Sequence, residues 1–134
     1  MDYVADAHAV VWRFFAPQRV GQAAHAAFDA ANAGAALIHL PAVALAEVIM
    51  VIEKKRLPGV SMAQLMDRIQ WMQGSANYEL LPLLPETVIA SHKLTAIPDI
   101  FDRLIVAEAQ RLGLPLITDD TLIRASGLAN VVWD

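Results

Sequence analysis

Short apolar runs alternate along the chain with longer segments in which apolar side chains recur at helical spacing. A short apolar run bounded by turn residues is typical of a buried strand, whereas apolar positions three and four apart indicate one face of a helix. Strands or extended segments are predicted at residues 3–5, 35–40, 78–84, 114–118 and 131–133. Helices are predicted at residues 7–15, 21–34, 42–57, 61–74, 85–94, 100–112 and 119–126.

Residues that start or stop helices stand at the ends of these segments. Pro17 follows the first helix, Gly34 is placed to cap the second, and Pro58 stops the third. Ser61 is a suitable N-cap for the fourth helix, and Pro85 suits the first turn of the fifth.

This alternation of strands and helices, without a repeat or a linker, predicts an α/β fold. We expect a mostly parallel central sheet covered by helices on both faces, in a single domain spanning residues 1–134. Such folds place their sites outside the carboxyl ends of the strands.

The composition suggests that the chain binds another protein, and it argues against a membrane span. Hydrophobic residues make up 57% of the chain, which suggests a surface buried against another protein. The most apolar stretch, residues 33–52, is interrupted by Pro41 and Glu47, so a strand, a turn and a buried helix explain it better than a membrane span.

Charge and cysteine content limit the function further. The chain has no cysteine, which excludes thiolate metal sites, and its first residues do not read as a signal peptide, so a cytoplasmic location is expected. The net charge of −4 argues against a general nucleic-acid binder, but not against a nuclease whose acids are covered by cations. We interpret the basic residues 54–56 as favourable charges at a helix C-terminus rather than as a phosphate-binding patch.

Acidic residues follow the predicted strands. Asp6 comes directly after the first strand, Asp119 and Asp120 follow the strand at 114–118, and Asp102 lies near the start of a helix. Each of them alone could be a helix cap, because aspartate is favoured there. In "IPDIFDRL", Asp99 is the expected cap and Asp102 the third helical residue.

Glu47 is harder to explain as a surface residue. Its neighbours three and four positions away on the predicted helix are all apolar, and a buried unpaired carboxylate is costly. A structural salt bridge to Arg103 or Arg13 is one explanation. A cation shared with Asp6, Asp102 and Asp120 is the interpretation we favour, with Mg²⁺ or Mn²⁺ as the ion that an all-carboxylate set prefers.

In this order, these segments resemble the PIN domain, and most closely the VapC ribonuclease toxins of toxin–antitoxin pairs. "YVADAHAVVW" is similar to the family's first motif, with Asp6 as its acid, and "LPAVALAEVIMVIEKKRL" to the second, with Glu47. "PDIFDRLIVAEAQRLGLPLITDD" resembles the last two, with Asp102 as one acid and Thr118 and Asp120 as a T-x-D motif.

The resemblance covers essentially the whole chain and implies a three-layer α/β/α sandwich. It also implies an Mg²⁺- or Mn²⁺-dependent endoribonuclease, usually a homodimer, with a cognate antitoxin protein that blocks the site. Two departures are visible. Asp119 duplicates the acid beside Asp120, and Ala7 replaces a hydroxyl residue that is common at that position.

The expected chemistry is hydrolysis of RNA phosphodiester bonds, with Asp6, Glu47, Asp102 and Asp120 holding one or two cations. Thr118 would orient Asp120 or a water molecule, and Asp99 and Asp119 would support the set. The base is either a carboxylate or a hydroxide on the metal. The alternative function is a non-catalytic PIN-like module that binds RNA or protein.

Several other residues are predicted to be structural. His8 lacks partners at the spacing of zinc ligands, and Arg103 is expected to form a salt bridge. The stripe formed by Met62, Leu65, Met66, Ile69 and Met72 is expected to face the core, with an antitoxin groove or a dimer contact as the alternative. Receiver and haloacid-type phosphatase folds fit poorly, because the first strand is followed by a single acid.

Overall fold

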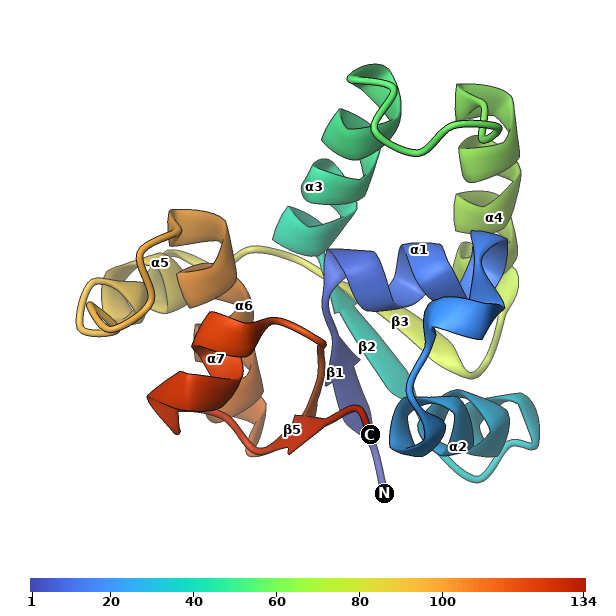
Figure 1. Cartoon of the computed structure of the whole chain (residues 1–134). Coiled ribbons are helices and arrows are strands. Elements are labelled where there is room, and N and C mark those ends of the chain that lie inside the picture. Colours follow the sequence, from blue (N-terminus) through green and yellow to red (C-terminus); the bar gives the residue numbers. More distant parts are fainter.

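A five-stranded parallel sheet forms the centre of the computed structural model, which describes all residues from 1 to 134 (Figure 1). The strand order is β3-β2-β1-β4-β5, and every neighbouring pair is parallel. The strands are β1 (Tyr3–Ala5), β2 (Ile38–Pro41), β3 (Tyr78–Leu81), β4 (Leu116–Ile117) and β5 (Val131–Val132). The predicted α/β class with a parallel sheet is confirmed.

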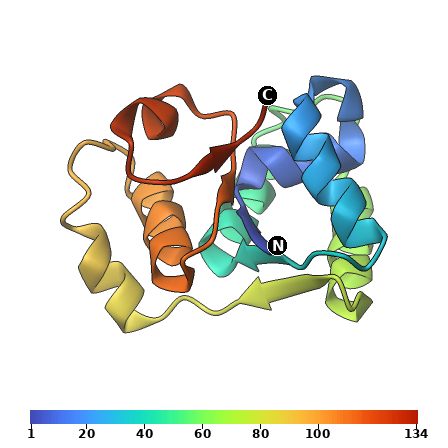
Figure 2. The same cartoon turned by 90° about the horizontal axis from the view of Figure 1, so that it is seen from below.

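Helices cover both faces of this sheet. In Figure 2, the side on the right is covered by α1 (Ala7–Phe15), α2 (Gln22–Asn32) and α4 (Met62–Gly74). The other side is covered by α5 (Pro85–Ser91), α6 (Ile100–Leu112) and α7 (Thr121–Ser126). Helix α3 (Ala42–Glu53) extends beyond the carboxyl ends of the strands and contacts both α1 and α6. A short 3-10 helix, η1 (Pro17–Arg19), follows α1 and was not predicted.

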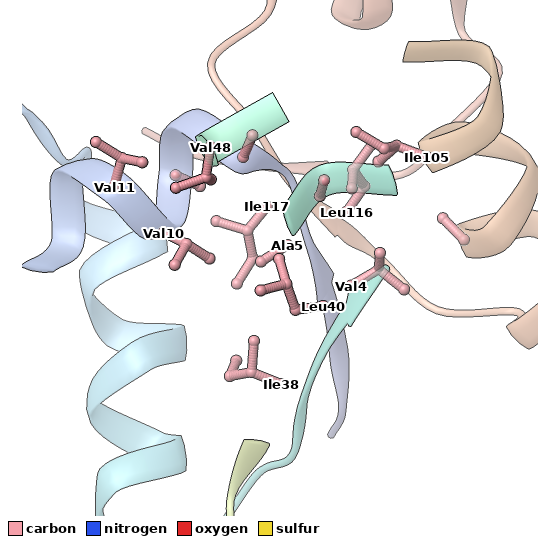
Figure 3. Packing of buried hydrophobic residues seen from close by; sticks show 14 of the residues in the cluster. Val4, Ala5, Val10, Val11, Ile38, Leu40, Val48, Ile105, Leu116 and Ile117 are labelled. Atoms are coloured by element: carbon pink, nitrogen blue, oxygen red, sulfur yellow. The ribbon is translucent and has the colours of Figure 1, made fainter. Parts of the chain in front are cut away.

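The core forms because successive side chains of each strand point to opposite faces. Val4 pairs with Leu116 in the sheet, and both lie near Ile105 of α6 (Figure 3). Ala5 and Ile117, one residue further along, pair with each other and belong to the same buried cluster of 32 residues. Since both faces of the sheet are covered by helices, the strands are apolar at nearly every position.

Two elements end earlier than the apolar pattern predicted, because the local backbone stops them. Helix α3 ends at Glu53 rather than at residue 57, because Lys55 adopts a left-handed conformation with φ of 54°. Strand β3 ends at Leu81, directly before Pro82, which has no N–H to donate. The expected caps are present, since Gly34 is left-handed and Ser61 forms a capping box with Gln64.

The apolar residues 33–52 do not form one continuous helix, and the apolar stripe of α4 packs against the core. Residues 33–52 are divided between β2 and α3, and none of the helices is both long and apolar enough to cross a membrane. In α4, Leu65 and Met72 are buried and Met62 and Ile69 pack against the core. Met66 is 41% exposed, so the stripe faces the core at four of its five positions.

Candidate metal centre

The predicted acids gather at one edge of the sheet, around a single cavity. Asp6 follows β1, Asp120 lies three residues beyond β4, Glu47 comes from α3 and Asp102 from α6. All four line a cavity of about 640 Å³, and Asp99 and Asp119 line it as well. Carboxyl ends of parallel strands meet at one edge, which is why residues from such distant segments come together.

Asp6 is at once a helix cap and an acid of the cavity. It is only 7% exposed, and its Oδ1 accepts a hydrogen bond of 2.9 Å from the backbone N–H of Ala9. Its Oδ2 accepts a hydrogen bond from the hydroxyl of Thr118. The fully buried Thr118 Oγ1 in turn accepts from the backbone N–H of Asp120 at 3.1 Å. Capping and membership of the acid set are therefore compatible, and Thr118 joins two of the acids.

Asp99 caps α6, whereas Asp102 lies in its first turn and lines the cavity, as the sequence predicted. Asp99 is the N-cap of α6 and accepts from the backbone N–H of Phe101 at 2.7 Å. Asp102 is the third residue of α6 and lines the cavity half-buried. Asp99 contributes more than a cap, since its charge raises the pKa of both Glu47 and Asp102.

The neighbours Asp119 and Asp120 differ in direction. Asp120 caps α7 by accepting from the N–H of Ile123 at 2.9 Å. Its charge raises the pKa of Asp6, Glu47 and Asp102. Asp119 is exposed, and its carboxylate lies 3.8 Å from Arg124. Asp120 is thus the inner acid of the two.

Glu47 has no cationic partner. Arg13 is paired with Asp29 at 2.8 Å, and the Nε of Arg103 donates to the carbonyl of Ile97. The salt bridge considered for Glu47 is therefore absent. Arg103 forms no salt bridge either, so the prediction made for Arg103 is wrong. Both arginines are held by partners that lie nearer to them along the chain.

Burial and crowding make the ionised form of these acids unfavourable. Burial, and after it repulsion from Asp102 and more weakly from the other acids, together raise the pKa of Glu47 from 4.5 to about 8. Burial, and after it repulsion from Asp120 and the other acids, together raise the pKa of Asp102 from 3.8 to about 7. The pKa of Asp6 is also raised by its burial, although the hydrogen bond from Thr118 acts in the opposite direction.

The donor chemistry of this set fits a hard divalent cation. The predicted site residues offer only carboxylate and hydroxyl oxygens, and a bound cation would offset the repulsion among the carboxylates. In the side-chain positions of the structure, no three histidine or carboxylate groups are placed to hold one ion. The acids would therefore have to draw closer together around a cation.

The cavity wall also contains residues that sequence reasoning did not assign to the site. They are Trp12, Arg19, Arg56 and Phe101, together with His8, which was predicted to be structural. His8 is exposed, and its ring packs edge-on against Trp12. Residues 54–56 follow α3 directly, with Lys54 as its C-cap, so their charges lie at the helix C-terminus as predicted, although the helix itself ends before them. For Arg56, the basic cluster directly after α3 was the one local signal in the sequence that could have pointed to the site.

A family model described as the PIN domain matches residues 3–126. No curated protein matches the sequence.

Several solved structures are similar to this chain in fold. VapBC2 from Rickettsia felis, solved with a DNA fragment from its promoter, has a TM-score of 0.70 at 15% identity, and the alignment covers 100% of both chains. FitAcB from Neisseria gonorrhoeae has a TM-score of 0.66 at 15% identity, with 96% of this chain and 95% of that chain covered. A toxin–antitoxin complex from Klebsiella pneumoniae has a TM-score of 0.64 at 20% identity, with 97% and 95% covered. At these identities the likeness concerns the fold. The family model, which spans nearly all of the sequence, shows that the chain belongs to the PIN domain family.

Proposed function

We propose that this protein is an Mg²⁺- or Mn²⁺-dependent endoribonuclease that acts as the toxin of a toxin–antitoxin pair. The observation that carries the proposal is the set of Asp6, Glu47, Asp102 and Asp120 around one cavity. None of these four carboxylates forms an ion pair within the chain. Acids crowded in this way, without a counterion, are expected where a cation binds.

The four acids would hold the cation, directly or through water. Bound there, it would neutralise charge on the phosphate and lower the pKa of an attacking water. Thr118 supports this arrangement from within the chain, because its hydroxyl bridges the Asp6 carboxylate and the Asp120 backbone. Asp99 and Asp119 add negative charge at the rim of the same cavity.

The proton of the attacking water needs an acceptor. In the metal-free protein, burial and mutual repulsion favour the protonated forms of Glu47, with a pKa of about 8, and Asp102, with a pKa of about 7. A bound cation would lower both pKa values and release these protons. In this proposal, the water's proton goes to an oxygen of Glu47 or Asp102 that does not face the cation.

A partner protein completes the proposal. One of the structurally similar proteins, from Klebsiella pneumoniae, was solved as a toxin–antitoxin complex. Large apolar side chains are exposed on α5 and near it, with Ile89 at 68% and Val88 at 44%. Burial of such side chains would stabilise a homodimer or an antitoxin complex. Because the substrate is cellular RNA, the proposal also places the protein in the cytoplasm.

RNA cleavage tests the proposal directly. Purified protein should cut RNA when Mg²⁺ or Mn²⁺ is present, and EDTA should stop it. The Glu47→Gln and Asp102→Asn variants should lose activity by orders of magnitude. Glu53→Gln is the matched control, since Glu53 lies on the same helix as Glu47 but outside the cavity.

Two results would overturn this function. Activity that survives thorough chelation would contradict the metal-carboxylate chemistry. RNA binding without any cleavage under these conditions would favour the non-catalytic module instead.

Light scattering and co-purification from the native host test the partner. A monomer at high concentration with no co-purifying protein contradicts both the dimer and the antitoxin.

A further inference from the structure

Two arginine side chains line the acidic cavity. Arg19 lies in η1 and Arg56 in the turn after α3, and both are exposed. Neither guanidinium forms an ion pair or a side-chain hydrogen bond. By contrast, Arg13, Arg111 and Arg124 are each paired with a carboxylate. The hydrogen-bonding capacity of the two cavity arginines is therefore unused.

Arg19 is held in place by stacking. Its guanidinium carbon lies 3.6 Å from the ring centroid of Trp12, which itself packs edge-on against Trp133. The η1 segment is fixed as well, because Nε2 of His25 is 2.8 Å from the carbonyl oxygen of Pro17. Stacking uses the flat face of a guanidinium and leaves its N–H edges free. Arg19 therefore presents a preorganised fork of donors at the cavity wall.

Arg56 reaches the cavity through an uncommon backbone turn. The N–H of Lys55 donates to Ile52 at 3.0 Å and that of Arg56 to Val51 at 3.1 Å, which ends α3 in a Schellman motif. Lys55 occupies the left-handed position where glycine is usual. The turn reverses the chain, so that Arg56 lines the cavity while Lys54 and Lys55 do not.

The charge of the cavity explains why such arginines are needed. Its wall carries six acidic side chains and these two arginines. An RNA strand brings one negative charge per nucleotide, so it would be repelled by the acids unless cations lie along its path. A guanidinium fork matches the geometry of phosphate oxygens and can hold them through two hydrogen bonds.

We propose that Arg19 and Arg56 bind the backbone phosphates that flank the scissile phosphate of a single-stranded RNA. This assignment rests on the proposed function for its substrate. Both are positioning residues: they fix the strand above the acids and take no part in proton transfer. The aromatic side chain of Phe101 on the same wall suits an unstacked base of a single strand.

Equilibrium binding of a fluorescein-labelled single-stranded RNA 12-mer tests the assignment. Fluorescence anisotropy is measured with Ca²⁺ in place of Mg²⁺ at several salt concentrations. Arg19→Gln and Arg56→Gln should each weaken binding about three- to tenfold. Each should also reduce the slope of log K against log salt by about 0.7, the loss of one phosphate contact to a single strand. In cleavage assays with Mn²⁺, each variant should raise KM more than it lowers kcat.

Arg68→Gln is the matched control. Arg68 also lies beside an aromatic ring, 5.2 Å from the centroid of Phe14, but outside the acidic cavity. Its removal should leave RNA affinity and salt slope within about twofold of wild type. If Arg19→Gln and Arg56→Gln bind as wild type does while wild type binds and cuts RNA, the phosphate assignment is wrong and the nuclease stands. If wild type binds RNA without cutting it and the two variants still bind more weakly, the assignment stands and the nuclease is wrong. Absence of RNA binding by wild type overturns both.

Discussion

Replacing Glu47 with glutamine should stabilise the metal-free protein at pH 8, because it removes a charge that the cavity disfavours. Glu47 has no ion-pair partner, and burial followed by repulsion from Asp102 raises its pKa from 4.5 to about 8. Between these values the folded protein keeps a proton that the unfolded chain has lost. The free energy of unfolding of wild type therefore falls as the pH rises through this window, whereas the glutamine variant escapes that loss.

The size of the effect follows from the shift. At face value, such a shift lowers the stability of wild type at pH 8 by about 4 kcal/mol. Because the Glu47 side chain is partly exposed, solvent screening reduces this figure, and we expect a gain of about 1–2 kcal/mol for the variant. That corresponds to a rise in Tm of roughly 4–8 °C for a chain of this length. At pH 5 the gain should be several-fold smaller, since folded wild type is then protonated at Glu47.

Thermal unfolding followed by circular dichroism in EDTA, at pH 5 and pH 8, measures this difference. Glu53→Gln, on the exposed end of the same helix, should show no such pH-dependent gain. Added Mn²⁺ should then raise the Tm of wild type more than that of Glu47→Gln, because a ligand stabilises according to its affinity for the folded state. The reasoning is refuted if Glu47→Gln melts well below wild type at pH 8 without metal. That result would mean that a partner stabilises the Glu47 charge.

Three further substitutions test other parts of the structure. Thr118→Val removes the hydroxyl that joins Asp6 to Asp120, so it should lower stability in urea by about 1–3 kcal/mol and reduce RNA cleavage. Thr118→Ser should restore both, and failure to do so contradicts the role of the hydroxyl. Lys55→Gly should raise stability by about 0.5–1 kcal/mol, because glycine adopts the left-handed conformation freely; a loss of stability in urea would argue against strain there. The buried Glu108 carboxylate accepts a hydrogen bond from Thr87 and pairs with Arg111 at 2.7 Å. Glu108→Gln removes its charge and should lower the free energy of unfolding by about 2–3 kcal/mol, with no direct effect on RNA binding. Unchanged unfolding in urea would show that the ion pair contributes little.

The sequence by itself determined the features that depend on near neighbours. Ser61, Asp99 and Gly34 were placed correctly, because a cap bonds within one helical turn and needs no other part of the chain. The strand–helix alternation was visible for the same reason. It also placed Asp6 and Asp120 together, since the carboxyl ends of parallel strands always meet at one edge.

Tertiary structure decided which side chains find each other across long separations in sequence. The hydroxyl of Thr118 donates a hydrogen bond to Asp6, which lies 112 residues away in the sequence. The carboxylate of Glu108 accepts a hydrogen bond from Thr87 of another helix. Arg13 pairs with Asp29 instead of Glu47 because α1 and α2 pack together. No periodicity contains this information, because it depends on how the helices dock on the sheet.

The two cavity arginines show the same limit most clearly. Arg19 had no motif around it, and only the docking of η1 against Trp12 places it at the acids. Arg56 stood in a visible basic cluster, yet its direction depends on a left-handed residue that apolar patterning cannot reveal. Local backbone energetics set where each helix starts and stops, whereas the packing of whole elements sets which charges share a cavity.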